Sequence, residues 1–316
     1  MVESIAITSQ LHASHQSALL VPAQKYTMFR VGGIDRQTWL NGLLTCDLLT
    51  RSQGAALYGL ILAPKGKVLT DLFLVERGEE IWLILPLVMR EEVQAFLDRH
   101  LIMEEVEILP YSGPFEIFFI HGPRAVEVMK TASAEKGWLA SGVLDRTGLG
   151  GALCVWDPSV FSDGIHPLRK ILDEREGIWG DTLGWEILRI ERGIPVFGID
   201  FDGTSYPQEA GLDKTAVSFS KGCYLGQEVV CMLELRGQVK KKLMRLAIQG
   251  DSPPPRGAEL TNKEGMVVGS ITSSEFHPGL DHVLALGWVK RSVAELGGPL
   301  QCGTAGVSVI PLFTSL

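Results

Sequence analysis

One short stretch of the chain gathers most of the side-chain types that carry out chemistry. Residues 221–228 read Lys-Gly-Cys-Tyr-Leu-Gly-Gln-Glu, so a thiol, an amine, a phenol, an amide and a carboxylate lie within eight positions. A cysteine reacts as its thiolate, and a neighbouring cation such as Lys221 would lower the pKa of Cys223, whereas burial would raise it. Gly222 and Gly226 permit backbone conformations that a side chain would forbid. Cys223 is therefore a candidate reactive group; the alternative is a tight turn around a cysteine that only packs.

The composition describes a folded protein with more than one core. The chain has 316 residues, of which 46% are hydrophobic, and this length favours two or three packed units. The formal net charge of -8 argues against a general nucleic-acid or anionic-membrane surface. Uninterrupted apolar stretches of about 18 residues do not occur, which excludes a membrane-spanning helix.

The cysteines and the first residues bear on the compartment. The five cysteines are odd in number, widely spread and without a Cys-x-x-Cys pair: Cys46, Cys154, Cys223, Cys231 and Cys302. This pattern predicts neither a disulfide scaffold nor a zinc or iron–sulfur site formed by this chain alone. Residues 1–10 carry no basic side chain and resemble neither a secretory signal nor a transit peptide. We expect a protein of the reducing cytoplasm, with no membrane partner.

Hydrophobic periodicity predicts a β-α-β-β-β-α-β order in the first third of the chain. The strands are expected at 26–31, 56–63, 68–76, 81–85 and 106–109, and the helices at 36–44, with Asp35 as N-cap, and at 90–101. The residues 64–67 read as the turn of a hairpin. This order suits an antiparallel or mixed sheet with helices on one face.

The remainder of the chain predicts a second mixed unit and a small barrel. Strands are expected at 115–121 and 152–156, and helices at 124–129, 167–175 and 183–193. The residues 197–219 lack periodicity, and so long a loop inside a compact protein is usually functional. After Glu228 we expect an extended segment up to Arg236. Short strands at 243–248, 266–269, 284–289 and 306–310 indicate a small β-barrel or sandwich.

Three stretches resemble the glycine-cleavage T-protein superfamily of folate-dependent aminomethyltransferases. They are residues 188–200, Leu-Arg-Ile-Glu-Arg-Gly-Ile-Pro-Val-Phe-Gly-Ile-Asp, then 207–212, Pro-Gln-Glu-Ala-Gly-Leu, and the Lys221–Glu228 motif. The last of these, with Gly226, Gln227 and Glu228, resembles one branch of the superfamily, the YgfZ-type folate-binding proteins. That branch is implicated in iron–sulfur cluster assembly or repair and, through it, in tRNA modification.

The resemblance implies an α+β fold with two interleaved mixed α/β units and a small C-terminal β-barrel, around a central opening. We assign residues 1–50 and 113–240 to a first, discontinuous unit that carries the folate and cysteine motifs. The residues 51–112 would form the second unit, and 243–316 the barrel. The resemblance also implies that tetrahydrofolate, or a folate derivative, binds near the opening.

The same resemblance suggests which residues would hold the folate. Glu191 matches the T-protein glutamate that accepts the paired N–H donors of the pterin, although it could be an exposed helical charge. Tyr206 and Tyr224 could wall the aromatic middle of the ligand, or could simply pack. Arg236, or the lysines at 240–242, could hold the anionic tail, although a solvated basic face is the common reason for such a run.

A departure from the T-protein pattern concerns the acidic site beside the reacting folate nitrogen. Aminomethyltransferases carry an Asp-Asp pair after a glycine hairpin, and this chain has Thr70 and Asp71 there. An acid beside a developing cation can stabilise it or move its proton, so Asp71 is a candidate catalytic residue. The loss of one acid, together with the gain of Cys223, favours thiol chemistry over aminomethyl transfer.

The sequence therefore predicts a tetrahydrofolate-binding accessory protein for iron–sulfur proteins, with Cys223 as its reactive group and cluster-assembly or client proteins as partners. The alternative is a folate-dependent aminomethyltransferase that uses Asp71 alone, and any enzymatic activity would be a one-carbon transfer of the aminomethyl or formyl type. A third, less favoured hypothesis is an RNA-binding module that uses residues 240–242 and Arg245. The pairs His12/His15 and His277/His282 lack further ligands at a familiar metal spacing, so no metal site is expected.

Overall fold

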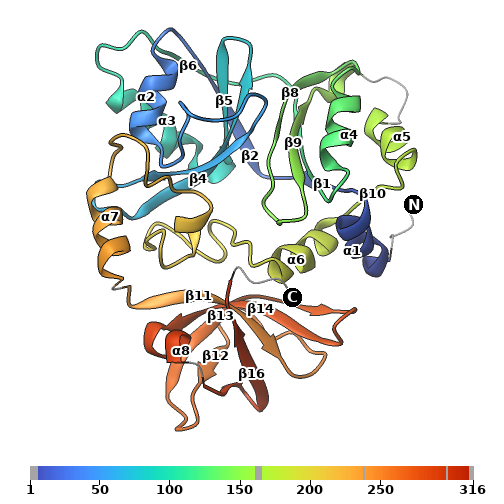
Figure 1. Cartoon of the computed structure of the whole chain (residues 1–316), viewed down its shortest axis with the longest axis vertical. Helices are drawn as coiled ribbons and strands as arrows, with labels where there is room; N and C mark the ends of the chain where they lie inside the picture. The colour runs from blue at the N-terminus through green and yellow to red at the C-terminus, as the bar shows by residue number, and fades with distance from the viewer. Residues whose placement is uncertain (1–5, 161–165, 238, 297, 313–316) are drawn as a thin grey trace.

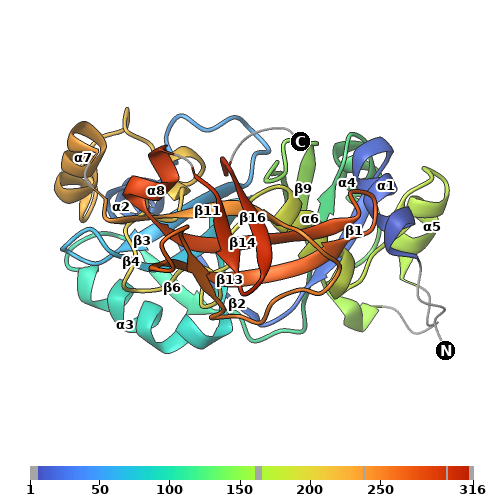
Figure 2. The same cartoon turned by 90° about the horizontal axis from the view of Figure 1, so that it is seen from below.

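The chain forms two five-stranded sheets, which we call sheet A and sheet B, and a closed β-barrel beneath them (Figure 1). This computed structural model describes residues 6–160, 166–237, 239–296 and 298–312. The ends of the predicted ranges, residues 1–5 and 313–316, lie outside the described residues. Among the described helices, none combines the length and the apolar character needed to cross a bilayer. Figure 2, seen from the barrel side, shows that the barrel lies beneath both sheets.

Sheet B contains the elements that were predicted as β-α-β-β-β-α-β, and its strand order is β3-β4-β5-β2-β6. Its elements are β2 (Tyr26–Gly32), α2 (Arg36–Leu43), β3 (Leu57–Leu62), β4 (Val68–Arg77), β5 (Glu80–Pro86), the 3-10 turn η1 (Leu87–Met89), α3 (Arg90–His100) and β6 (Glu107–Pro110). Asp35 precedes α2 but makes no side-chain cap, because its carboxylate accepts the Glu105 N–H at 2.9 Å. Asp35 is therefore the N-cap residue, as predicted, but its side chain does not cap the helix.

Sheet A has the order β10-β1-β7-β9-β8, and it is mixed because β1 and β10 run parallel. Its strands are β1 (Leu19–Ala23), β7 (Glu116–His121), β8 (Trp138–Val143), β9 (Gly151–Trp156) and β10 (Ile178–Trp179). The associated helices are α1 (Ile7–Gln16), α4 (Ala125–Ala132), the 3-10 turn η2 (Pro158–Val160), α5 (Pro167–Asp173) and α6 (Thr182–Glu191). The helices predicted around 124–129, 167–175 and 183–193 are α4, α5 and α6.

The chain passes from sheet A to sheet B earlier than the predicted division at residue 50. Strand β2 pairs in antiparallel register with β5 and β6, so residues 26–43 belong with 57–110. The physical reason is that Phe29 and Val31 are fully buried in the core beneath α2 and α3. The chain returns to sheet A between β6 and β7.

The C-terminal part is a closed barrel with strand order β11-β14-β13-β12-β15-β16, in which β16 pairs back onto β11. Its elements are β11 (Lys241–Ile248), β12 (Glu259–Thr261), β13 (Val267–His277), β14 (His282–Lys290), α8 (Arg291–Leu296), β15 (Leu300–Cys302) and β16 (Ala305–Ile310). The predicted fold class, an α+β arrangement of two mixed units with a small C-terminal barrel, is confirmed.

The segment after the motif is a helix, and the extended conformation predicted for it is wrong. Helix α7 (Gln227–Arg236) begins after Gly226 and ends at Gly237, which has a left-handed φ of 57°. Only Val230 of this helix is buried. Because a single buried position leaves no 3.6-residue apolar stripe, the periodicity of the sequence could not reveal the helix.

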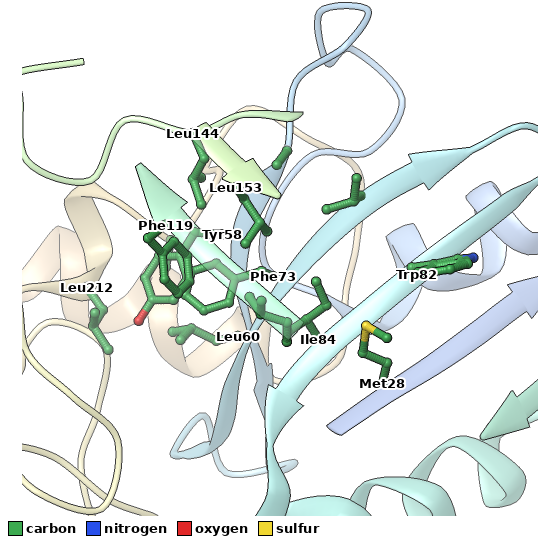
Figure 3. Packing of buried hydrophobic residues seen from close by; sticks show 14 of the residues in the cluster. Met28, Tyr58, Leu60, Phe73, Trp82, Ile84, Phe119, Leu144, Leu153 and Leu212 are labelled. Atoms are coloured by element: carbon green, nitrogen blue, oxygen red, sulfur yellow. The ribbon is translucent and has the colours of Figure 1, made fainter. Parts of the chain in front are cut away.

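The two sheets pack face to face through an aromatic core. Phe73 of β4 lies 4.9 Å, centroid to centroid, from Phe119 of β7, and the Tyr58 ring of β3 stacks on Phe73 at 5.1 Å (Figure 3). Alternation along β4 sends Phe73 and Val75 towards sheet A, and Leu72 and Leu74 towards α2 and α3. Each such aromatic pair contributes about 0.5–1.5 kcal/mol beyond its burial.

Helix α6 joins the sheets to the barrel through a buried ion pair. Arg189 of α6 donates to Asp200 at 2.9 Å, and the second Asp200 oxygen accepts the hydroxyls of Thr272 and Ser273 of β13 at 2.6 and 2.7 Å. Arg189 and Asp200 are 0% and 1% exposed. The carboxylate of Glu186 is a second partner of Arg189, at 2.5 Å, so the buried guanidinium is paired with two carboxylates.

We predict that Asp200→Asn lowers the free energy of unfolding by roughly 1.5–3 kcal/mol, because it removes one of the two carboxylates that pair with the buried Arg189 and leaves Glu186 as its remaining ionic partner. Urea unfolding followed by tryptophan fluorescence measures the change. The control is Glu295→Gln in the exposed pair with Arg291, which should have a much smaller effect because solvent screens both charges. Equal effects of the two substitutions would contradict a central role for the buried pair.

Candidate functional site

A cavity of about 390 Å³ opens where the two sheets meet the long loop after α6. Its walls come from three places: the start of β3 with the residues after α2, the turn between β8 and β9, and the loop that holds the 3-10 turn η3 (Leu212–Lys214). Apolar side chains such as Leu57, Leu144 and Ile194 alternate with polar groups at the rim. The size and mixed lining are typical of a site for a small organic molecule.

Arg146 places a cation in this cavity. Its guanidinium lies 4.9 Å from the ring centroid of Tyr58 and 5.0 Å from that of Phe73, in the geometry of a cation–π contact. The turn that carries it is fixed by Asp145, whose carboxylate accepts the backbone N–H groups of residues 147, 148 and 150. Arg192 donates to the Thr147 carbonyl from below at 2.6 Å. Arg146 is therefore held by a rigid turn.

Asp71 lies behind this aromatic wall and is almost fully buried, at 6% exposure. The Tyr58 hydroxyl donates to it at 2.9 Å. Burial raises the pKa of Asp71, while the charge of Arg146 and the Tyr58 hydrogen bond act in the opposite direction. Burial, with the nearby Asp71 charge, also raises the pKa of Tyr26 to about 12. The Asp71 carboxyl group can thus hold a proton or a negative charge close to the cavity.

Thr70 does not share this environment with Asp71. Thr70 pairs with Ile61, which faces α2 and α3, whereas Asp71 pairs with Leu60, which faces sheet A. The Thr70 hydroxyl donates to the Asp71 carbonyl at 3.0 Å. A second acid at position 70 would therefore point to the opposite face of β4. The replacement of that acid by Thr70 therefore leaves the Asp71 carboxylate, which faces sheet A, unchanged. The missing second acid is then no argument against Asp71 as a catalytic acid.

His121, at the end of β7, is a buried polar group without a hydrogen bond. It is 1% exposed, and neither ring nitrogen finds a partner among the described residues. Its ring stacks on Trp185 of α6, with centroids 4.8 Å apart and planes 5° apart. Burial, assisted by the charge of Arg146, lowers the pKa of His121 to about 3, so the ring is neutral near pH 7. Unpaired buried nitrogens of this kind are costly unless they serve a ligand or bound water.

The Lys221–Glu228 motif forms an exposed turn followed by the first turn of α7. Cys223 is exposed, as is Gly222, while Gln227 and Glu228 open the helix. Gly226 adopts a left-handed φ of 82°, and a Cβ there would lie 3.0 Å from the Ala63 carbonyl. This close approach seats the turn on the β3–β4 hairpin.

The Lys221 ammonium serves the backbone instead of the thiol, contrary to its predicted role. It is buried and donates to the carbonyls of Asn41, Leu44 and Cys46 at 2.6, 2.8 and 2.7 Å. These carbonyls belong to the last turn of α2 and the residues after it, where helical carbonyls lack intrahelical partners. Burial lowers the pKa of Lys221 to about 8.

Glu191 is buried, not an exposed helical charge. Its carboxylate lies between two histidines, 3.1 Å from Nε2 of His15 on α1 and 3.3 Å from Nε2 of His277 on β13. Burial opposes its ionisation, but the hydrogen bond from His277 and the nearby cations lower the pKa of Glu191. Glu191 is absent from the described residues that line the cavity. Its pterin role stays a prediction, and it would require the carboxylate to leave the histidines.

The other residues predicted to bind the folate, Tyr206, Tyr224 and Arg236, lie apart from one another. Tyr224 is buried in the core, and its hydroxyl has no hydrogen-bond partner within the described ranges. Tyr206 is half-buried with the Lys67 ammonium 5.7 Å above its ring. Arg236 is exposed at the end of α7. The structure therefore does not bring Tyr206, Tyr224 or Arg236 into the wall of the cavity.

The residues of the RNA hypothesis are largely engaged within the protein. Arg245 is 1% exposed and donates to the Glu191 carbonyl. Lys241 lies 4.0 Å above the Trp288 ring, and Lys242 pairs with Glu295 at 3.3 Å. Groups of three or more His, Cys, Asp or Glu side chains that could hold a metal ion do not occur within the described part of the chain.

Comparison with known proteins places this geometry in a family. Residues 3–142 match the GCVT N-terminal domain, and residues 241–311 match the glycine cleavage T-protein C-terminal barrel domain, together more than half of the chain. The chain belongs to the glycine cleavage T-protein superfamily.

Relatives of this superfamily cover nearly the whole chain. An aminomethyltransferase of Nostoc sp. is 26% identical over 96% of this chain and 85% of its own length, and one of Thermotoga petrophila is 25% identical over 96% and 87%. The crystal structure of the aminomethyltransferase T of the Bartonella henselae glycine cleavage system superposes with a TM-score of 0.81 at 21% identity. That superposition covers 98% of this chain and 89% of the other, and it shows the shared fold.

Sequence patterns did not single out Arg146, Tyr58 or His121 as site residues. Arg146 stands in Asp-Arg-Thr-Gly, whose Asp followed by Thr and Gly indicates a tight turn, and this signal could have suggested a fixed cation. His121 precedes Gly-Pro at the end of an apolar strand, which indicates only a strand end. Nothing in the sequence shows that these residues meet.

We predict that His121→Phe flattens the acid sensitivity of the protein. The His121 pKa is 6.5 when unfolded and about 3 when folded, so the unfolded chain takes up a proton that the native state refuses. Stability linked to His121 is present above pH 6.5 and is lost as the pH falls towards 3, at about 1.4 kcal/mol per pKa unit.

Urea unfolding between pH 7 and pH 4 measures this effect. The slope of stability against pH should be smaller for His121→Phe than for the wild type. His12→Phe changes an exposed histidine and should keep the wild-type slope. The same slope in all three proteins would show that His121 is not buried as a neutral ring.

Proposed function

We propose that this protein binds a tetrahydrofolate derivative in the cavity between the sheets and acts as an accessory protein in iron–sulfur cluster assembly or repair. Cys223 would be its reactive group. The observation that carries the proposal is the position of the thiol: Cys223 is exposed, and it follows, after five residues, the stretch that ends at Ser218 and lines the cavity. A ligand site and a thiol that a partner protein can reach are thus joined in one structural unit.

The residues present fit a folate. The cavity combines the flat wall of Tyr58 and the aliphatic side chains of Leu57 and Leu144 with the cation of Arg146. A flat heteroaromatic ring needs apolar walls, and its anionic glutamate tail needs a cation or backbone donors. His121 does not line the cavity, but it lies within electrostatic reach of Arg146, which does. Bound tetrahydrofolate would supply a carrier for a one-carbon unit.

The thiol would act on a partner protein, not inside the cavity. Cys223 faces solvent, whereas Cys46, which does line the cavity, is buried, and burial raises its pKa to about 12. A thiol with so high a pKa is a poor nucleophile at neutral pH. Accessibility therefore separates the two cysteines, and Cys223 is the one that another protein can reach.

A second candidate function is a folate-dependent aminomethyltransferase. It is favoured by Asp71, which, unlike Thr70, faces sheet A and lies beside Tyr58 within electrostatic reach of Arg146. A buried acid with a raised pKa can hold or move a proton beside a bound ligand. Relatives that are 24–26% identical carry the name aminomethyltransferase. In this function Asp71 would do the chemistry and Cys223 would not be required.

We predict that Arg146→Met weakens binding of 5-formyltetrahydrofolate by about tenfold or more, because a charge-assisted contact contributes about 1.5–3 kcal/mol. Isothermal titration calorimetry measures the affinity. The matched control is Arg77→Met, which removes an exposed arginine that lies 4.9 Å above Trp82. Cys223→Ala should also bind as the wild type does.

Two outcomes would overturn the folate assignment. They are the absence of a binding isotherm with the wild type and an equal affinity in Arg146→Met and Arg77→Met. Glu191→Gln separates two roles in the same titration. Lost affinity would support its contact with the pterin, whereas intact affinity with a lower melting temperature would assign it to the contact between His15 and His277.

We predict that Cys223→Ala abolishes the support of iron–sulfur enzymes in cells that lack the wild-type protein, while folate affinity is retained. Assays of a cluster-containing enzyme in these cells measure the effect, and Cys302→Ala, a half-buried cysteine of the barrel, is the control. Full cluster-enzyme activity in Cys223→Ala would refute the proposal. Folate-dependent release of ammonia from an aminomethylated lipoyl carrier, lost in Asp71→Asn, would instead establish the second candidate.

A further inference from the structure

Two segments far apart in the sequence are bonded side by side between the cavity and the thiol. The first is residues 41–46, the end of α2 and the turn after it, and the second is residues 216–225, which carries Cys223. The Thr45 hydroxyl donates to the Ala216 carbonyl at 2.6 Å, and the Ser218 N–H donates to the Thr45 carbonyl at 2.8 Å. The Leu225 N–H donates to the Gly42 carbonyl at 3.1 Å.

We call the contact between residues 41–46 and residues 216–225 the seam. Lys221 lies at its centre. Its ammonium uses all three donors on the carbonyls of Asn41, Leu44 and Cys46, at 2.6–2.8 Å. It also lies 5.3 Å from the ring centroid of Tyr224. A cation at the carboxyl end of a helix is favoured by the unpaired carbonyls and the helix dipole. Lys221 is 9% exposed, so removal of its charge would leave buried carbonyls without donors.

Both segments of the seam also form the cavity wall. Cys46 and Asp47 line the cavity from the α2 side, and Ala216, Val217 and Ser218 line it from the other. The exposed thiol of Cys223 is two residues beyond Lys221. The contacts that hold the thiol in place are therefore the contacts that shape one wall of the cavity.

We propose that Lys221 is a positioning residue for Cys223, and that its clamp on the end of α2 couples occupancy of the cavity to the mobility of the turn that carries the thiol. A molecule in the cavity that contacts Cys46 and Ser218 would hold the two segments together and restrain the turn. Release of the clamp would separate the thiol from the ligand site without altering either group. The proposal has two arms. The coupling arm, in which a ligand in the cavity restrains the turn, rests on the proposed folate function. The positioning arm, in which Lys221 holds the turn of Cys223, does not.

Amide hydrogen exchange tests both arms, because the Ser218 and Leu225 N–H groups belong to the seam. In Lys221→Met these two amides should exchange about tenfold faster or more, since a local opening that becomes easier by about 1.4 kcal/mol gives that factor. The amides of β13 and β14 should stay unchanged. Lys221→Arg, which keeps the charge and several donors, should restore part of the protection, and Lys130→Met on α4 should behave as the wild type.

Adding 5-formyltetrahydrofolate gives the second readout. In the wild type it should slow exchange at Ser218 and Leu225, and in Lys221→Met this response should disappear while calorimetric affinity stays within about threefold, or less than 1 kcal/mol. Cluster-enzyme support in cells should fall in Lys221→Met and recover in Lys221→Arg. Such a separation of thiol-dependent function from ligand affinity is not expected of a residue that only stabilises the fold.

The outcomes distinguish the two arms. Unprotected Ser218 and Leu225 amides in the wild type would overturn the clamp whatever the variants do. If Lys221→Met fails to fold, shown by alkylation of the buried Cys154, the milder Lys221→Gln replaces it. If Lys221→Gln also unfolds, hydrogen exchange of the wild type decides. The Ser218 and Leu225 amides must then show a lower free energy of opening than the β13 amides, which means that the clamp opens locally; equal values would overturn the proposal. An absent folate response with intact protection would refute the coupling and the folate function, but not the positioning role.

Discussion

The arrangement of the three units depends on the buried pair of Arg189 and Asp200. The pair stands where the end of α6, the loop after it and strand β13 of the barrel meet, and the hydroxyls of Thr272 and Ser273 complete the coordination of the carboxylate. Burying two charges is costly, and the ion pair, the two hydroxyls and the second carboxylate partner of Arg189, Glu186, offset that cost. The barrel can therefore sit in one position beneath the sheets, which fixes the loop that closes the cavity.

The cavity owes its chemistry to the low polarity between the sheets. Aromatic rings from both sheets exclude water, so the few polar groups among them act on one another strongly. Asp71 is pushed towards its protonated form by burial and drawn back by Arg146 and Tyr58, and His121 is kept neutral. This combination gives an acid, a cation and a neutral base within a small space. Both proposed functions draw on the same groups, and they differ in whether the reacting group is Asp71 or Cys223.

Comparison of the two cysteines near α2 shows how the fold divides their roles. Cys46 is buried in the cavity wall, where burial raises its pKa, and Cys223 is exposed. Lys221 lies between them and is bonded to the backbone of the first segment. The motif that drew attention in the sequence is thus built less to activate its thiol than to hold it at a fixed place beside the cavity.

The sequence by itself determined the order of elements in sheet B, the barrel and the superfamily, because alternation, turn residues and local motifs are properties of neighbouring positions. That order includes the strand that became β2, but only packing shows that β2 pairs with β5 and β6 and not with the strands of sheet A. Helix α7 stayed hidden because only Val230 is buried. Only the tertiary structure decided that Lys221 serves the end of α2 and that Glu191 lies between His15 and His277. These contacts join residues more than 80 positions apart, and burial in the folded state, not spacing along the chain, creates them.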